Sequence, residues 1–118
     1  MATSTMSLSA KWRDISSEFT VNGTYCSEFK AYTDGHMVYL RMIAKAGTSD
    51  QTNLVTNIPS VYRALGNIQV ALNTFWMNWT DGGKSVCAYV MTSAIQLRTV
   101  GDIAGSGGVL VSGCYPIE

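Results

Sequence analysis

The sequence predicts a single all-β domain of antiparallel strands, folded as a compact β-sandwich or a barrel-like sheet. Three observations lead to this fold class. The 118-residue chain is 47% apolar and only 14% charged, which suits one domain with one core. Its 11 glycines, with many threonines and valines, favour strands joined by tight turns. Short alternating segments recur along the chain, whereas no stretch of about twelve residues keeps a helical period.

The clearest element is a hairpin over residues 27–46. Residues 29–32 form its first strand, Thr33, Asp34 and Gly35 its turn, and residues 36–43 its return strand. Asp-Gly between alternating runs is a strong turn signal, because both positions must tolerate positive φ. The return strand has one uniformly apolar face, which we expect to face the core. That face consists of Val38, Leu40, Met42 and Ala44, and the opposite face of Met37, Tyr39, Arg41 and Ile43.

Further strands follow at similar intervals. They are expected at residues 68–72, 75–79, 85–90, 94–100 and 109–111. The sequence Thr-Asp-Gly-Gly at 80–83 is a turn, across which the strand at 85–90 pairs back. In the strand at 94–100, Ile95 and Leu97 face one side, and Gln96 and Arg98 face the other. The Gly-rich segment 105–108 is a loop, and Pro59 favours a loop over a helix at 59–65.

The charge and cysteine content exclude several function classes. Eight basic and eight acidic side chains give a net charge of zero without a Lys/Arg cluster, so we expect no nucleic-acid partner. No apolar run approaches the roughly 18 residues of a membrane span, so we expect no membrane insertion. Residues 1–11 have the composition of a flexible lead, or of the stub of an upstream element, rather than of a signal peptide, which leaves 12–118 as the domain. The chain has three cysteines, Cys26, Cys87 and Cys114, and no two of them form a C-x-x-C motif. We expect all three thiols to be buried and reduced.

Residues suited to catalysis are scarce. His36 is the single histidine and lies at the predicted turn, and the acids are scattered, mostly at turns. Asp at a turn usually accepts hydrogen bonds from its own backbone. No P-loop, dinucleotide fingerprint, H-E-x-x-H motif or EF-hand loop is present. We therefore expect no catalytic residue, no cofactor and no metal. A small cell-wall glycan hydrolase, with a carboxylate pair assembled by folding, is kept as an alternative.

The most informative cluster is Phe-Trp-Met-Asn-Trp at residues 75–79, where Trp76 and Asn78 share one strand face. One interpretation buries both faces, one in the core and one at a subunit interface, since tryptophan is highly buried on average. The other exposes Trp76 and Asn78 to a ligand, because an indole face packs on sugar C–H groups and an amide bonds to hydroxyls. The candidate saccharide-binding residues are Trp76 and Asn78, then Gln96 and Arg98 of a nearby strand, then Asp34 and His36 of the turn.

Five motifs occur in order along the chain. They are Trp-Arg-Asp-Ile at 12–15, Gly-His-Met-Val-Tyr-Leu-Arg at 35–41, Asn-Ile-Pro-Ser-Val-Tyr-Arg at 57–63, the Gly-rich loop at 105–108 and Ser-Gly-Cys-Tyr-Pro-Ile at 112–117. In this order and spacing, the chain over residues 12–118 resembles the C-terminal head domain of receptor-binding and minor tail proteins. These proteins belong to siphophages of Gram-positive hosts, especially lactococcal phages.

The resemblance implies a head domain that forms a homotrimer at the tail tip of the virion, after synthesis in the cytoplasm of the bacterial host. Its implied partners are host cell-wall polysaccharide or another surface glycan and other phage tail proteins, with no catalysis. Relatives typically carry His and Asp at the positions of Trp76 and Asn78, so we expect a different sugar here. They usually carry Pro at the position of Ala64, and this departure weakens the loop part of the resemblance without removing it. A structural baseplate or capsid-decoration subunit of the same fold, without a specific ligand, is the alternative function.

Overall fold

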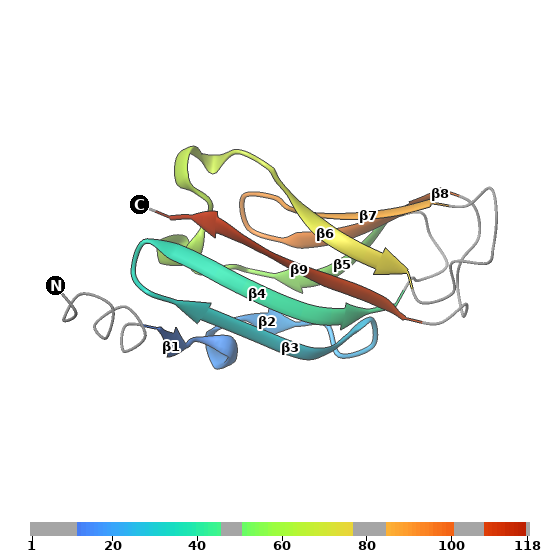
Figure 1. Ribbon diagram of the computed structural model, residues 1–118, viewed down its shortest axis with the longest axis horizontal. Coiled ribbons are helices and arrows are strands. Elements are labelled where there is room, and N and C mark those ends of the chain that lie inside the picture. Colours follow the sequence, from blue (N-terminus) through green and yellow to red (C-terminus); the bar gives the residue numbers. More distant parts are fainter. Residues whose placement is uncertain (1–11, 46–50, 77–84, 101–107, 118) are drawn as a thin grey trace, which may run out of the picture.

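Nine strands form one antiparallel sheet in the computed structural model, which describes residues 12–45, 51–76, 85–100 and 108–117. The sheet curls into a half-barrel (Figure 1), and the predicted all-β class is confirmed. The strand order is β1-β3-β4-β9-β6-β7-β8-β5-β2. The strands are β1 (Arg13–Asp14), β2 (Thr20–Val21), β3 (Cys26–Thr33), β4 (Met37–Ala44), β5 (Gln51–Thr56), β6 (Val70–Trp76), β7 (Ser85–Val90), β8 (Ile95–Val100) and β9 (Val109–Pro116). Short 3-10 turns are η1 (Ser16–Glu18), η2 (Ser60–Tyr62) and η3 (Leu65–Asn67).

Strand β6 joins two halves of the sheet, because it pairs with a different neighbour at each end. Residues 70–72 pair with β7, and residues 73–76 pair with β9. We call β1, β3, β4, β9 and residues 73–76 the β4 half, and the remaining strands with residues 70–72 the β8 half. Leu72 packs on Gly113 of β9, where an added Cβ would lie 2.7 Å from the Leu72 Cδ2 atom. A side chain at position 113 would therefore displace the end of the Leu72 side chain, which shows how closely β6 and β9 pack at this point.

The core contains side chains from both halves of the sheet. β4 buries the apolar face predicted for it, and β8 buries Ile95 and Leu97 while Arg98 is exposed, also as predicted. Tyr115 of β9 is fully buried, and its hydroxyl donates a 2.8 Å hydrogen bond to the Tyr62 carbonyl. Burial raises the pKa of the Tyr115 hydroxyl, which therefore stays protonated as a donor. The outward face of β4 is fixed by this packing, because its alternate residues are committed to the core.

Several expected strand boundaries are corrected. Ile68 is exposed and lies outside the strands, and Phe75 and Trp76 belong to the same strand as residues 70–72. The last strand, expected to end at residue 111, continues as β9 to Pro116. The sequence gives no signal for β1, β2 and β5. Asn78, the turn expected at 80–83, most of the loop at 105–108 and the lead at 1–11 lie outside the described residues.

Candidate functional site

Trp76, the leading candidate for ligand contact, belongs to the core rather than to the surface. Its side chain is 9% exposed, whereas its neighbour Phe75 is 58% exposed. The expected exposure of Trp76 is therefore corrected: the face of β6 that carries Leu72 and Trp76 is the inner one. The Trp76 indole N–H is buried and has no hydrogen-bond partner among the described residues. A buried donor without an acceptor is costly, so the burial of the ring must outweigh that cost.

Gln96 and Arg98 lie on the outer face of β8, on the other side of the sheet from Trp76. The Gln96 side chain is already engaged, because its carbonyl accepts from the Tyr89 hydroxyl at 2.8 Å and from the Gln51 amide. Its own amide donates to the Asn53 Oδ1 atom at 2.8 Å. These bonds brace β5, β8 and β7 against one another across the outer face. The fold therefore does not bring Gln96 and Arg98 together with Trp76.

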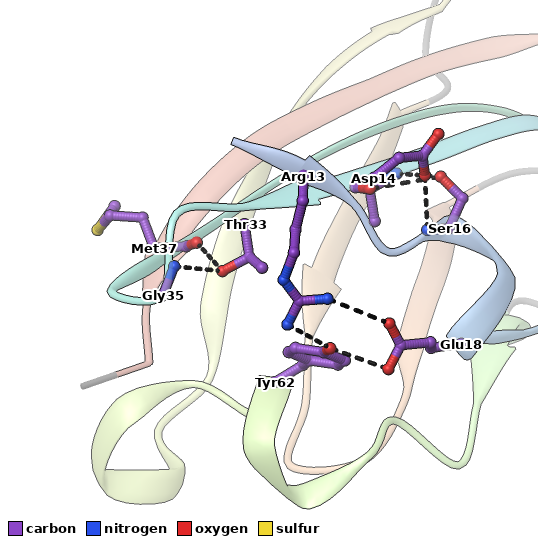
Figure 2. Close-up of polar contacts among 9 residues, drawn as sticks. Arg13, Asp14, Ser16, Glu18, Thr33, Gly35, Met37 and Tyr62 are labelled. Carbon is purple, nitrogen blue, oxygen red and sulfur yellow. Dashed lines mark hydrogen bonds and ion pairs between the residues drawn. The ribbon is translucent and has the colours of Figure 1, made fainter. Parts of the chain in front are cut away.

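Asp34 and His36 lie in the turn between β3 and β4, as expected. The Asp34 carboxylate accepts from the backbone N–H groups of His36 and Met37, both at 2.9 Å. Thr33 Oγ1 accepts from the Gly35 N–H at 3.0 Å and donates to the Met37 carbonyl at 2.7 Å (Figure 2). The two backbone bonds to Asp34 hold the pKa of its carboxyl below the usual value. Asp34 thus has the local turn-forming role that its residue type predicts.

An aromatic hollow lies directly beside this turn, on the outer face of the β4 half. Tyr32 of β3, Tyr39 of β4 and Cys114 of β9 stand side by side in register. Trp12, which precedes β1, and Met37 complete the hollow. Trp12 is 43% and Tyr39 is 38% exposed, so two large rings remain open to solvent. We use the name aromatic hollow for the surface formed by Trp12, Tyr32, Met37, Tyr39 and Cys114.

The segment that carries Trp12 is held against the sheet by a polar cluster around Tyr62 (Figure 2). The Arg13 guanidinium donates to the Tyr62 hydroxyl at 3.3 Å and lies 3.7 Å from the Glu18 carboxylate. The Tyr62 hydroxyl in turn donates to Glu18 at 2.9 Å. The rings of Phe19 and Tyr62 stack with their centroids 5.8 Å apart. Because the Tyr62 side chain is buried, these contacts hold Arg13 within β1 and Glu18 after it, and Arg13 is the direct neighbour of Trp12.

The cysteines are free, and two of them differ from the expected burial. Cys26 is buried, which raises the pKa of its thiol to about 11. Cys87 and Cys114 are exposed, and Cys114 forms part of the aromatic hollow. Exposure follows from strand position, because Cys114 is on the outward-facing side of β9 while its neighbour Tyr115 fills the core.

Part of this site could be found from the sequence. Alternation along residues 36–43 places Met37 and Tyr39 on the outward face. The predicted hairpin also brings Tyr32 beside them. The alternation does not reveal that Trp12 and Cys114 join this group, because these two residues come from segments that are distant in the sequence. The resemblance pointed instead to the strand at 75–79, whose Trp76 is buried.

Neither a metal cluster nor a membrane-spanning helix occurs in the part of the chain that the structure describes. No group of three or more His, Cys, Asp or Glu side chains is placed to bind a metal there. No helix within it is long and apolar enough to cross a membrane. Comparison with protein-family models, curated proteins and solved structures found no match. A functional assignment must therefore start from the geometry of the aromatic hollow and from the sequence motifs.

Proposed function

We propose that this chain is a non-catalytic binding domain that attaches a phage tail to saccharide on the host cell surface, and that the aromatic hollow is its contact surface. The observation that carries the proposal is the exposure of Trp12 and Tyr39 next to each other on one sheet face. Large aromatic side chains are usually buried, so a group of them in a surface hollow indicates a binding site. The motif order described above supports the phage tail context.

The chemistry of the hollow suits sugars. Aromatic ring faces pack on the apolar C–H faces of sugar rings, and tyrosine hydroxyls can donate to and accept from sugar hydroxyls. Tyr32 and Tyr39 are held on adjacent, paired strands, so little conformational freedom is lost on binding. A single shallow contact is expected to be weak, and several copies on one tail raise the effective concentration enough for firm attachment.

A subunit contact is favoured by a separate apolar side chain, Phe75 of β6. Phe75 lies beside β9, outside the aromatic hollow, and is 58% exposed. We propose that the surface around Phe75 forms the contact of a homotrimer. Light scattering on a sizing column should then give roughly three times 12.8 kDa, and Phe75→Asp should give monomers. A wild-type monomer at micromolar concentration would rule out the trimer.

The experiment that tests the proposed function is adsorption of the fluorescently labelled domain to Gram-positive cells and to their purified walls. We expect the domain to adsorb to both cells and walls. Periodate oxidation of the wall sugars should abolish adsorption, whereas protease treatment of the walls should leave it unchanged. Adsorption that survives periodate but not protease would show a protein receptor and contradict the proposal. Release of reducing sugar from the walls would favour the hydrolase alternative, and absence of adsorption would favour a structural subunit.

A further inference from the structure

We infer, on the basis of the proposed function, that the saccharide is an extended chain bearing acidic groups, and that Arg41 binds one of these groups. The inference starts from a second hollow that adjoins the aromatic one. Tyr39 lines both hollows, and the second is also lined by Arg41, Leu110 and Ser112. The two together form one surface along the outer face of β4, which we call the outer groove.

The length of the outer groove determines the kind of ligand that fills it. Met37 lines one end and Ile43 the other, and both lie on β4. A strand rises about 3.3 Å per residue, so the six steps from Met37 to Ile43 span about 20 Å. That span exceeds a single sugar ring. A chain of several sugars can therefore stack on the rings of the aromatic hollow and continue past Tyr39 toward Leu110.

The charge of the outer groove points to an acidic group on that chain. Lys30 and Arg41 are direct cross-strand partners, and Ser112 stands on the other side of Arg41. Like charges directly opposite each other in a sheet destabilise it, so the pair calls for an explanation beyond folding. The positive charge of Lys30 is partly balanced by the Asp14 carboxylate. The pKa of the Asp14 carboxyl is lowered mainly by hydrogen bonds from Ser16 and, to a smaller extent, by the charge of Lys30. Arg41 has no ion pair with any described residue.

Arg41 is suited to the role because its guanidinium presents parallel donors to a carboxylate or a phosphate. The Ser112 hydroxyl beside it can add a further donor. Glu28 also borders the second hollow, at a bulge in β3 where its φ is +53°. Its carboxylate disfavours a second acidic group nearby. The ligand is therefore expected to carry one anionic group at Arg41 and uncharged sugars on either side.

The test is a microarray that pairs acidic saccharides with neutral counterparts. Uronic-acid chains are paired with their methyl esters, and phosphodiester-bearing chains with their dephosphorylated forms, so the two sources of acidity are distinguished. Wild-type protein should bind the best acidic chain about tenfold more tightly than its neutral counterpart, the low end for a charge-assisted contact at an exposed site. Affinity should increase with chain length and level off once the groove is filled.

Matched variants locate the effect. Arg41→Gln should abolish the tenfold preference, so that the acidic chain binds no more tightly than its neutral counterpart. Lys45→Gln removes the same charge from an exposed residue that directly follows β4 and does not line the outer groove, and should keep the preference. The inference is overturned if no acidic chain binds better than its counterpart, or if Arg41→Gln keeps the preference. The proposed function survives both results as long as the domain adsorbs to cell walls. If Arg41→Gln instead dissociates an oligomer in light scattering, the groove is a subunit interface and the inference is also wrong.

Discussion

For Trp76, the alternation of side chains along a strand does not predict whether the residue faces the core or the solvent. Period-two alternation sorts residues 75–79 into two faces but does not say which face is inside when both carry large side chains. The decision depends on β9, which pairs with residues 73–76 and comes from the far end of the chain. With β9 in place, Trp76 lies opposite Val109 and faces the core. No local pattern in the sequence contains this information.

We predict that Trp76→Ala lowers the free energy of unfolding by about 3–5 kcal/mol, the usual cost of removing a large buried ring. Trp76→Phe should cost clearly less, because it keeps a ring and removes an indole N–H that has no partner among the described residues. Urea unfolding followed by circular dichroism measures both. If Trp76→Ala unfolds at the same urea concentration as the wild type, the side chain is not part of the core.

The cysteines allow a second prediction at the scale of single residues. Maleimide should label Cys87 and Cys114 in the folded protein but Cys26 only after unfolding, because Cys26 is buried and its thiol pKa is raised to about 11. A bound wall saccharide should protect Cys114, which lines the aromatic hollow, and leave the labelling of Cys87 unchanged. Mass spectrometry of the labelled peptides reads out each site. If the saccharide protects Cys87 and Cys114 equally, or protects neither, the binding site does not lie in the aromatic hollow.

At the scale of elements, regular strands could be predicted and irregular ones could not. β4 and β8 alternate without interruption, and their inner and outer faces are as expected. In β5 the register shifts between Asn53 and Val55, so that Leu54 and Val55 are both buried and the alternation is lost. β1 and β2 have two residues each, too few to show a period. The position of Trp12 in the aromatic hollow could not be predicted for the same reason, because Trp12 is positioned by the short strand β1.

We predict that Tyr62→Phe lowers the free energy of unfolding by about 1 kcal/mol, since Arg13 and Glu18 lose the buried hydroxyl that links them. Adsorption to cell walls should also weaken, because the segment that carries Trp12 is less firmly held. Tyr25→Phe is the control, since the Tyr25 ring packs on the core and its hydroxyl bonds to no described residue. If both variants behave alike in unfolding and in adsorption, the cluster around Tyr62 does not position the hollow.

The turn between β3 and β4 gives a prediction about pH. The pKa of Asp34 is lowered by the N–H groups of His36 and then of Met37, so it lies below the unfolded value of about 3.9. The ionised carboxylate therefore stabilises the fold above about pH 4, and this stabilisation disappears as the pH falls through the lower folded pKa. Asp34→Asn keeps an acceptor oxygen but does not titrate. Its urea midpoint should fall less steeply than that of the wild type between about pH 5 and pH 2. Parallel curves would mean that Asp34 does not contribute.

For the molecule as a whole, the curled sheet divides the outer surface into two kinds of face. The β8 half presents amides and a tyrosine hydroxyl that bond to one another, as Gln96 does with Asn53 and Tyr89. The β4 half presents open aromatic rings, an Arg41 that forms no ion pair with any described residue, and exposed apolar side chains such as Phe75. A surface that satisfies its own polar groups has less to gain from a ligand than one that leaves rings exposed. We therefore place the proposed binding function on the β4 half.

The central claim is that the aromatic hollow binds cell-surface saccharide, and its most direct test is wall adsorption by Tyr39→Ala. Tyr39 is exposed, so its removal should leave the circular dichroism spectrum and the unfolding midpoint close to those of the wild type. Ile68→Ala is the matched control, because Ile68 is exposed, apolar and outside the outer groove. We predict at least a tenfold loss of adsorption for Tyr39→Ala, in line with loss of a stacking contact and of its hydroxyl, and none for Ile68→Ala. Normal adsorption by a folded Tyr39→Ala protein would contradict the account.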